Sequence, residues 1–178
     1  MNMNNITLEE QKAIKSWTSD SKEYRYIKQI LKGERINFFH DFYEKRANDL
    51  INMFLKYKDN TNNKVLFRGD VIESNEEFNF IISKKVGEIF VLEGTLLSFT
   101  LNKKIAIESY QKSDKIKGIN TSTILIIIEN RKSVFLDISK YSHFPNEKEV
   151  ICNKNLEFII KNIEVKKDNH IEIILDEV

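Results

Sequence analysis

Three short polar motifs in this chain contain side chains that bind phosphates or stabilise positive charge. The first is Leu-Phe-Arg-Gly-Asp around Arg68. We expect Arg68 at the end of a strand, from which a planar guanidinium can hold a phosphate through two parallel hydrogen bonds. Gly69 has no side chain and therefore allows a ligand to approach closely. The alternative is an exposed arginine at a strand end that pairs with a carboxylate.

Ser98 and Thr100 belong to the second motif, Ser-Phe-Thr. In a strand both hydroxyls point to one face and Phe99 points to the other. Two hydroxyls on one face can orient a carboxylate or a sugar hydroxyl. The alternative is that they cap the helix that we expect to follow.

Glu147 and Glu149 form the third motif, which follows a turn-like segment over residues 141–146. An extended chain would place both carboxylates on one side and Lys148 on the other. Paired carboxylates can stabilise a cationic sugar transition state and position an incoming base. The alternative is a solvated run of charges at the start of a strand.

The composition of the chain argues against several classes of function. Lys and Arg number 28 against 27 Asp and Glu, so the net charge of +1 provides no overall basic field for nucleic acid or anionic lipid. The single cysteine, Cys152, and three separated histidines lack the spacing of metal ligands, and no glycine-rich phosphate loop is present. We therefore expect no metal, no nucleic acid and no membrane partner.

Aliphatic residues run without a break only from Ile124 to Ile128, far short of the roughly 20 residues that span a bilayer. This run predicts a strand that is buried on both faces. The first residues contain neither a basic start nor an apolar segment of the length that a signal peptide needs. We expect no classical signal peptide.

Helical signals come first in the chain. Thr7 and Glu10 form a capping-box pattern, which predicts a helix with Trp17 on its inner side. A second helix is expected over about residues 22–32, ended by Gly33. A third is indicated by apolar residues that recur at steps of three and four. These residues are Ile36, Phe39, Tyr43, Ala47, Leu50, Phe54 and Tyr57.

Beyond residue 63 apolar and polar residues alternate, which predicts strands. The alternating apolar positions are Val65, Phe67, Leu156, Phe158, Ile160, Ile171, Ile173 and Leu175. A short helix is expected over about residues 102–111. Helices gathered before strands indicate an α+β fold with antiparallel sheet packing. The length of 178 residues fits one domain, with a helical arm over residues 1–60 and a mostly stranded core over 61–178.

The order of the three motifs resembles the Arg, Ser-Thr-Ser and Glu-x-Glu signature of arginine-specific mono-ADP-ribosyltransferases, a family with clostridial binary-toxin enzymes and animal ecto-enzymes. Residues 13–18 and 24–31 resemble the family's helix with a Tyr-Thr turn and its Tyr-x-x-Ile-Asn-x-x-Leu pattern. Residues 97–106 are similar to Ser-Thr-Ser-Leu-x-x-x-Val-Ala, and residues 142–151 to Ser-x-x-Pro-x-Glu-x-Glu-Val-Leu. Trp17 replaces a tyrosine of the family.

The resemblance implies an ADP-ribosyltransferase-like fold, with two perpendicular antiparallel sheets around an NAD cleft and flanking N-terminal helices. It implies that NAD is the substrate, that Arg68 beside Gly69 holds one of its phosphates, and that Tyr24 contacts it from the helical arm.

Ser98, by the same resemblance, orients Glu149. Glu149 accepts a hydrogen bond from the 2′-hydroxyl of the nicotinamide ribose and stabilises the ribosyl cation. Glu147 holds or deprotonates the guanidinium of the target.

The function implied is transfer of ADP-ribose from NAD to an arginine side chain of a target protein, with release of nicotinamide. Two alternatives stay open: NAD hydrolysis on the same fold, and a noncatalytic module that binds a partner through its aromatic helical surface. The partner implied is the modified protein, and the chain is expected to be a monomer. It would act in a bacterial or phage cytoplasm, or as a secreted toxin or effector delivered to a host cell.

Overall fold

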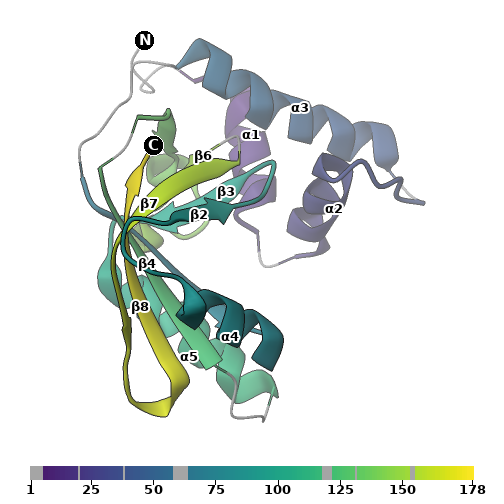
Figure 1. Cartoon of the computed structure of the whole chain (residues 1–178). Helices are drawn as coiled ribbons and strands as arrows, with labels where there is room; N and C mark the ends of the chain where they lie inside the picture. The colour runs from purple at the N-terminus through teal and green to yellow at the C-terminus, as the bar shows by residue number, and fades with distance from the viewer. Residues whose placement is uncertain are drawn as a thin grey trace. The chain divides into compact units, whose positions relative to one another are not determined.

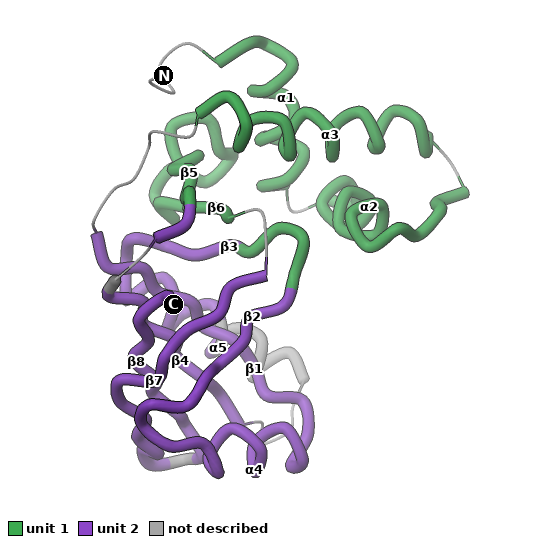
Figure 2. Tube along the Cα trace, turned by 45° about the horizontal axis from the view of Figure 1, so that its top comes forward, with its two compact units in different colours: residues 1–62, 94–97, 134–154 green, residues 63–93, 98–133, 155–178 purple. Residues whose placement is uncertain are grey.

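The computed structural model divides the chain into two compact units (Figure 2). It describes residues 6–19, 21–37, 39–57, 64–117, 122–130, 132–152 and 155–178. The helical unit comprises residues 1–62, 94–97 and 134–154. The sheet unit comprises residues 63–93, 98–133 and 155–178. The expected division into an arm over residues 1–60 and a core over 61–178 stays a prediction.

The helical unit contains three α-helices and a short strand pair among its described residues (Figure 2). The elements are α1 (Leu8–Trp17), α2 (Lys22–Leu31), α3 (His40–Lys56), β5 (Phe135–Asp137) and β6 (Glu149–Cys152), with the last two antiparallel. The capping box at the start of α1 is confirmed. The Thr7 amide donates to the Glu10 carboxylate at 2.6 Å, and the Glu10 amide donates to the Thr7 hydroxyl at 3.2 Å.

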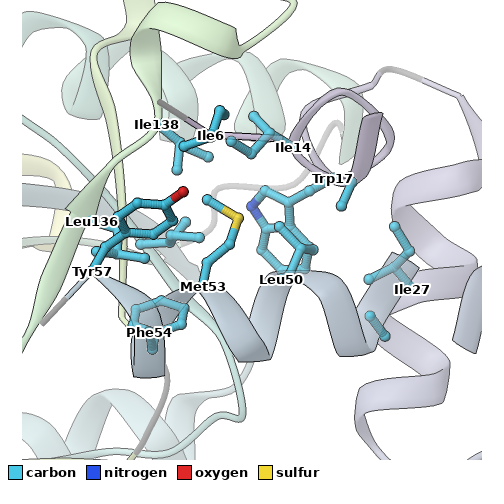
Figure 3. Packing of buried hydrophobic residues seen from close by; sticks show 13 residues of the cluster. Ile6, Ile14, Trp17, Ile27, Leu50, Met53, Phe54, Tyr57, Leu136 and Ile138 are labelled. Carbon is cyan, nitrogen blue, oxygen red and sulfur yellow. The ribbon is translucent and has the colours of Figure 1, made fainter. Parts of the chain in front are cut away.

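Apolar side chains from the three helices and from β5 and β6 form one buried cluster (Figure 3). Its buried members are Ile6, Ala13, Ile14, Trp17, Ile27, Ala47, Leu50, Met53, Phe54, Tyr57, Leu136, Ile138 and Ile151. The helical periodicity of residues 43–57 is therefore confirmed. Burial of such side chains stabilises each by about 1.5–3 kcal/mol relative to exposure. The helices are thus held together chiefly by this core.

The expectation for Phe39 was wrong. Helix α3 begins at His40, so Ile36 and Phe39 precede it and the helical period does not apply to them. Phe39 is the N-cap residue, has a left-handed backbone (φ 57°), and leaves 75% of its side chain exposed.

A carboxylate on α1 neutralises a buried arginine on α3, which makes the stability of this unit depend on pH. Hydrogen bonds from Lys12 and Arg46 hold the pKa of Glu9 at about 2, below its ordinary 4.5. Because the folded pKa is the lower one, this stabilisation is complete above about pH 4.5 and is lost as the pH falls towards 2. Wild type should lose more urea resistance between pH 6 and pH 3 than Glu9→Gln, as urea midpoints at both pH values will show. Equal losses would contradict this role for Glu9.

The sheet unit contains a mixed sheet (Figure 1). In spatial order its strands are β2 (Ile89–Leu92), β7 (Leu156–Val165), β8 (His170–Glu177), β4 (Ser122–Asn130), β1 (Leu66–Ile72) and β3 (Leu97–Thr100). Neighbours are antiparallel except β4 and β8, which are parallel. The expectation of purely antiparallel packing is corrected here, because alternation shows which face is buried but not the direction of the neighbouring strand.

Strand β4 lies in the interior of this sheet, between β8 and β1. Residues 124–128 are at most 7% exposed, so the expected strand buried on both faces is confirmed. Two helices cover its faces. Ala106 of α5 (Lys103–Lys117) packs against Leu125 and Ile127, and Ile81 of α4 (Asn75–Ser83) lines a cavity on the other face.

Helix α4 (Asn75–Ser83) was not anticipated, although its cap carries a recognisable signal. The Ser74 hydroxyl accepts from the Glu77 amide at 3.0 Å, which is the first half of a capping box. Helix α5 extends to residue 117, beyond the expected end near 111. None of the described helices combines the length and apolar character that a membrane crossing requires.

Candidate active site

Arg68 is the third residue of β1 and not at its end, which corrects its expected position. Its guanidinium donates through Nη1 to the carbonyl oxygen of Ser98 at 3.2 Å. Nε and Nη2 donate to one carboxylate oxygen of Asp70 at 3.2 and 2.8 Å. The pairing with a carboxylate that we held as the alternative is therefore present.

The ion pair with Asp70 leaves part of the hydrogen-bonding capacity of the Arg68 guanidinium for a ligand. Its three hydrogen bonds use three of the five N–H donors of a guanidinium, and the second N–H of Nη1 and of Nη2 is not needed for them. The Arg68 side chain is 28% exposed and Asp70 is 52% exposed, so their attraction contributes no more than about 1 kcal/mol. We infer that Asp70 orients Arg68 and still permits a bidentate contact with an anion.

Gly69 lies opposite Leu125 of β4, on the face of the sheet that α5 covers. Its carbonyl oxygen accepts a hydrogen bond from the Ser109 hydroxyl of α5 at 3.3 Å. The structure thus places a helix beside this glycine.

Ser98 and Thr100 lie on β3, as expected for a strand motif. Thr100 is buried, and its hydroxyl accepts from the Asn102 amide at 3.0 Å. The side chain of Asn102 in turn accepts from the Lys104 amide at 3.1 Å, so Asn102 supplies the cap of α5. Ser98 is half-buried, and its carbonyl oxygen holds Arg68.

A cavity of about 320 Å³ lies on the same face of the sheet as Arg68. Arg68 pairs with Ile126 and Asp70 pairs with Ile124, and both isoleucines line the cavity. The other lining residues are Asp70, Val71, Ile72, Glu73, Glu77, Ile81, Phe90 and Leu92. The cavity thus combines apolar walls with three carboxylates, which can accept hydrogen bonds from the hydroxyl groups of a ligand.

Glu149 begins β6 in the helical unit, where it is half-buried. One carboxylate oxygen, Oε1, accepts a hydrogen bond from the indole Nε1 of Trp17 at 3.0 Å. The backbone is also held, since the Ile138 amide donates to the Glu149 carbonyl oxygen at 3.0 Å. Both the side chain and the main chain of Glu149 are therefore fixed.

Tyr24 on α2 packs edge-on against Trp17, with ring centroids 5.0 Å apart. The Lys28 ammonium lies over the Tyr24 ring, 5.7 Å from its centroid. The structure thus connects Tyr24, Trp17 and Glu149 into one chain of contacts. The sequence predicted for Trp17 only a place on the inner face of a helix. The signal for more was that the resembling family has a tyrosine at this position.

Glu147 is exposed and does not lie in extended chain, which corrects the alternation expected for the third motif. It ends a 3-10 turn over residues 145–147, and Lys148 follows with a left-handed backbone (φ 49°). Pro145 starts the turn, since its fixed φ suits the first position of a helical turn. Two-residue alternation therefore applies only from Glu149 onwards.

The site residues fall into two groups. Arg68, Gly69 and Ser98 belong to the sheet unit, whereas Tyr24, Glu147 and Glu149 belong to the helical unit. Within the described ranges no three His, Cys, Asp or Glu side chains cluster as metal ligands would.

The sequence matches no protein-family model and no curated protein. The fold, in contrast, matches solved ADP-ribosyltransferases. The Vis toxin of Vibrio splendidus, in complex with agmatine, has a TM-score of 0.68 at 16% identity, over 99% of this chain and 77% of that one. HopU1 of Pseudomonas syringae has a TM-score of 0.64 at 17% identity, over 95% and 76%.

A third similar structure is exoenzyme S of Pseudomonas aeruginosa, bound to carba-NAD and human 14-3-3 protein beta. It has a TM-score of 0.60 at 16% identity and covers 96% of this chain and 74% of that chain. At these identities the likeness establishes the fold, which is that of the ADP-ribosyltransferases.

Proposed function

We propose that the protein is a mono-ADP-ribosyltransferase that moves ADP-ribose from NAD to an arginine side chain of a target protein and releases nicotinamide. The observation that carries the proposal is the placement of three residues within this fold. Arg68 lies on β1, Ser98 on β3 and Glu149 at the start of β6, in the chain order of the resembling family. Exoenzyme S, which shares the fold, binds an NAD analogue.

NAD binding is assigned to Arg68 and its surroundings. The two Nη nitrogens suit one phosphate of the diphosphate, because a planar guanidinium matches the spacing of two phosphate oxygens. Gly69 lies next to Arg68 on β1, and the adjoining cavity with its carboxylates suits a ribose. Tyr24 contacts the cofactor from α2. In the arrangement that the resemblance implies, NAD lies in a cleft between two perpendicular sheets.

Cleavage breaks the bond between C1′ of the ribose and the nicotinamide nitrogen. The bonding electrons leave with nicotinamide, and positive charge develops on the ribose ring. Glu149 accepts a hydrogen bond from the 2′-hydroxyl and stabilises this charge, and Ser98 orients Glu149. A carboxylate already held in place stabilises the transition state without reorganising at that moment.

Binding of the group that accepts ADP-ribose is assigned to Glu147. Its exposed carboxylate suits a protein-borne guanidinium, which it holds and deprotonates before nitrogen attacks C1′. The Vis toxin, which shares the fold, binds agmatine, a small molecule that ends in a guanidinium. That complex supports a guanidinium acceptor for this chain.

The partner in this proposal is the modified protein, and the chain acts as a monomer without metal. Similar folds occur in proteins named toxins and a type III effector. We therefore propose delivery into a host cell as the setting, with the cytoplasm of the producing bacterium or phage-infected cell as the alternative.

The proposal is tested by incubating the protein with labelled NAD and a mixed lysate, with agmatine as a second acceptor. Label on protein together with nicotinamide release supports the transferase. Nicotinamide release without labelled protein or agmatine would show an NAD glycohydrolase instead. If neither labelled product nor nicotinamide forms, the noncatalytic interaction module is the hypothesis that remains.

Arg68 should account for much of the stabilisation by NAD. NAD at about 100 times its Kd stabilises the folded state by about 2.7 kcal/mol, which raises the Tm of a chain of this size by roughly 5–10 °C. Arg68→Ala should lose most of this shift, as thermal denaturation with and without NAD will measure. Arg25→Ala, which removes an exposed arginine of α2, should keep it.

The variant Arg68→Lys distinguishes the contribution of positive charge to NAD binding from that of the planar guanidinium. Lysine keeps the positive charge but lacks the planar fork, so it should restore only a small part of the shift. An equal NAD-induced rise in Tm in wild type and Arg68→Ala would contradict the assignment of Arg68 to a phosphate of NAD.

A further inference from the structure

Trp17 contacts the proposed catalytic carboxylate directly, although it lies 132 residues away in sequence. It is the last residue of α1, and only 3% of its surface is exposed. An indole N–H can donate but not accept, and a buried one needs an acceptor. In this structure the acceptor is Oε1 of Glu149, at 3.0 Å.

The end of α1 holds the segment before Glu149 at a second point. The amide of His143 donates to the hydroxyl of Thr18, the residue that follows Trp17, at 3.0 Å. Trp17 itself is packed in the buried cluster of the helical unit, as Figure 3 shows. Two neighbouring residues at the end of one helix therefore hold the segment from residue 143 to 149.

An uncharged donor suits this position for an electrostatic reason. A lysine or arginine would also fix the carboxylate, but its positive charge would oppose the cation that develops on the ribose. The indole fixes one oxygen of Glu149 and adds no positive charge of its own. A carboxylate has about four acceptor positions, so this bond is compatible with a further one from a ribose hydroxyl.

We propose that Trp17 is a positioning residue that aligns the Glu149 carboxylate for nicotinamide cleavage through its indole N–H. This inference rests on the proposed function. The edge-on contact between Trp17 and Tyr24 extends the same support to the residue assigned to NAD.

The hydrogen bond itself is tested without any activity. The chain has one tryptophan, so the ¹H–¹⁵N spectrum contains one indole N–H resonance. Glu149→Gln replaces a charged acceptor by a neutral one and should move this resonance upfield. Glu147→Gln, two residues away, should leave it in place. An indole resonance that is the same in wild type and Glu149→Gln would overturn the proposal.

The catalytic consequence is tested with Trp17→Phe, which keeps an aromatic ring and removes the N–H. A hydrogen bond to a charged group is worth a factor of at least about 10, so kcat for nicotinamide release should fall on the order of 10-fold. The KM for NAD should change much less, since binding is assigned to Arg68. Trp17→Tyr restores a donor and should recover part of kcat.

A matched control exists in the same core. Tyr57 is only 1% exposed, and its hydroxyl donates to the Glu10 carboxylate at 3.1 Å. Tyr57→Phe removes a buried aromatic donor from a carboxylate outside the proposed site. It should lower the Tm but leave kcat unchanged.

The outcomes distinguish failure of the proposed function from failure of the role of Trp17. Wild type that releases no nicotinamide would overturn the proposed function. Active wild type with an unchanged kcat in folded Trp17→Phe, or an equal loss in Tyr57→Phe, would overturn the role of Trp17 alone.

Discussion

Glu149→Gln is expected to lower both ADP-ribose transfer and NAD hydrolysis by a factor on the order of 10²–10³, the usual cost of losing one preorganised stabilising group. Glutamine keeps the size of the side chain and an oxygen that can accept from Trp17, so the fold should survive. It removes the negative charge beside the ribosyl cation, on which both reactions depend. Nicotinamide release and label transfer from the purified variant are the measurements.

Glu157→Gln is the matched control for this variant. Glu157 is exposed on β7 and pairs with Val91, so the same chemical change occurs at a strand position outside the proposed site. Its activity should equal that of wild type. Wild-type nicotinamide release from folded Glu149→Gln would show that the third motif is a solvated charge run, as its alternative held.

Glu147→Gln is expected to separate the two reactions. It removes the carboxylate assigned to the incoming guanidinium and keeps Glu149. Loss of a positioned base costs about 10²–10⁴ in rate, so transfer to arginine or agmatine should collapse. NAD hydrolysis should stay largely intact, because water replaces the guanidinium and the sugar chemistry is unchanged.

The geometry of Glu147 supports this separation. The 3-10 turn and the left-handed Lys148 take Glu147 out of the strand that begins at Glu149, and its side chain is exposed. Transfer at the wild-type rate would show that Glu147 does not meet the acceptor. Equal loss of both reactions in both variants would contradict the assignment of separate roles to the two glutamates. It would not contradict the proposed enzyme class.

Local patterns predicted the elements well where the stabilising interactions are local. The capping box of Thr7 and Glu10 joins residues three apart, and the burial of residues 124–128 follows from five consecutive aliphatic side chains. The Arg68 pair with Asp70 is likewise local, since residues two apart on a strand share a face. In each case the partners lie within a few residues, so their types and order suffice.

Local patterns failed where one residue leaves the regular backbone. Phe39 and Lys148 adopt left-handed conformations, which end the helical period before α3 and the alternation before β6. A pattern of apolar residues contains no signal for such a single change of φ.

The sequence by itself determined the three motifs, their order, most helices and the central buried strand. Only the tertiary structure decided that β4 and β8 run parallel, and that the indole of Trp17 donates a hydrogen bond to Glu149. The physical reason is the same for both. Strand direction and contacts between distant side chains depend on which elements pack together, and that choice is made by the burial of the whole chain, not by the residues of any one segment.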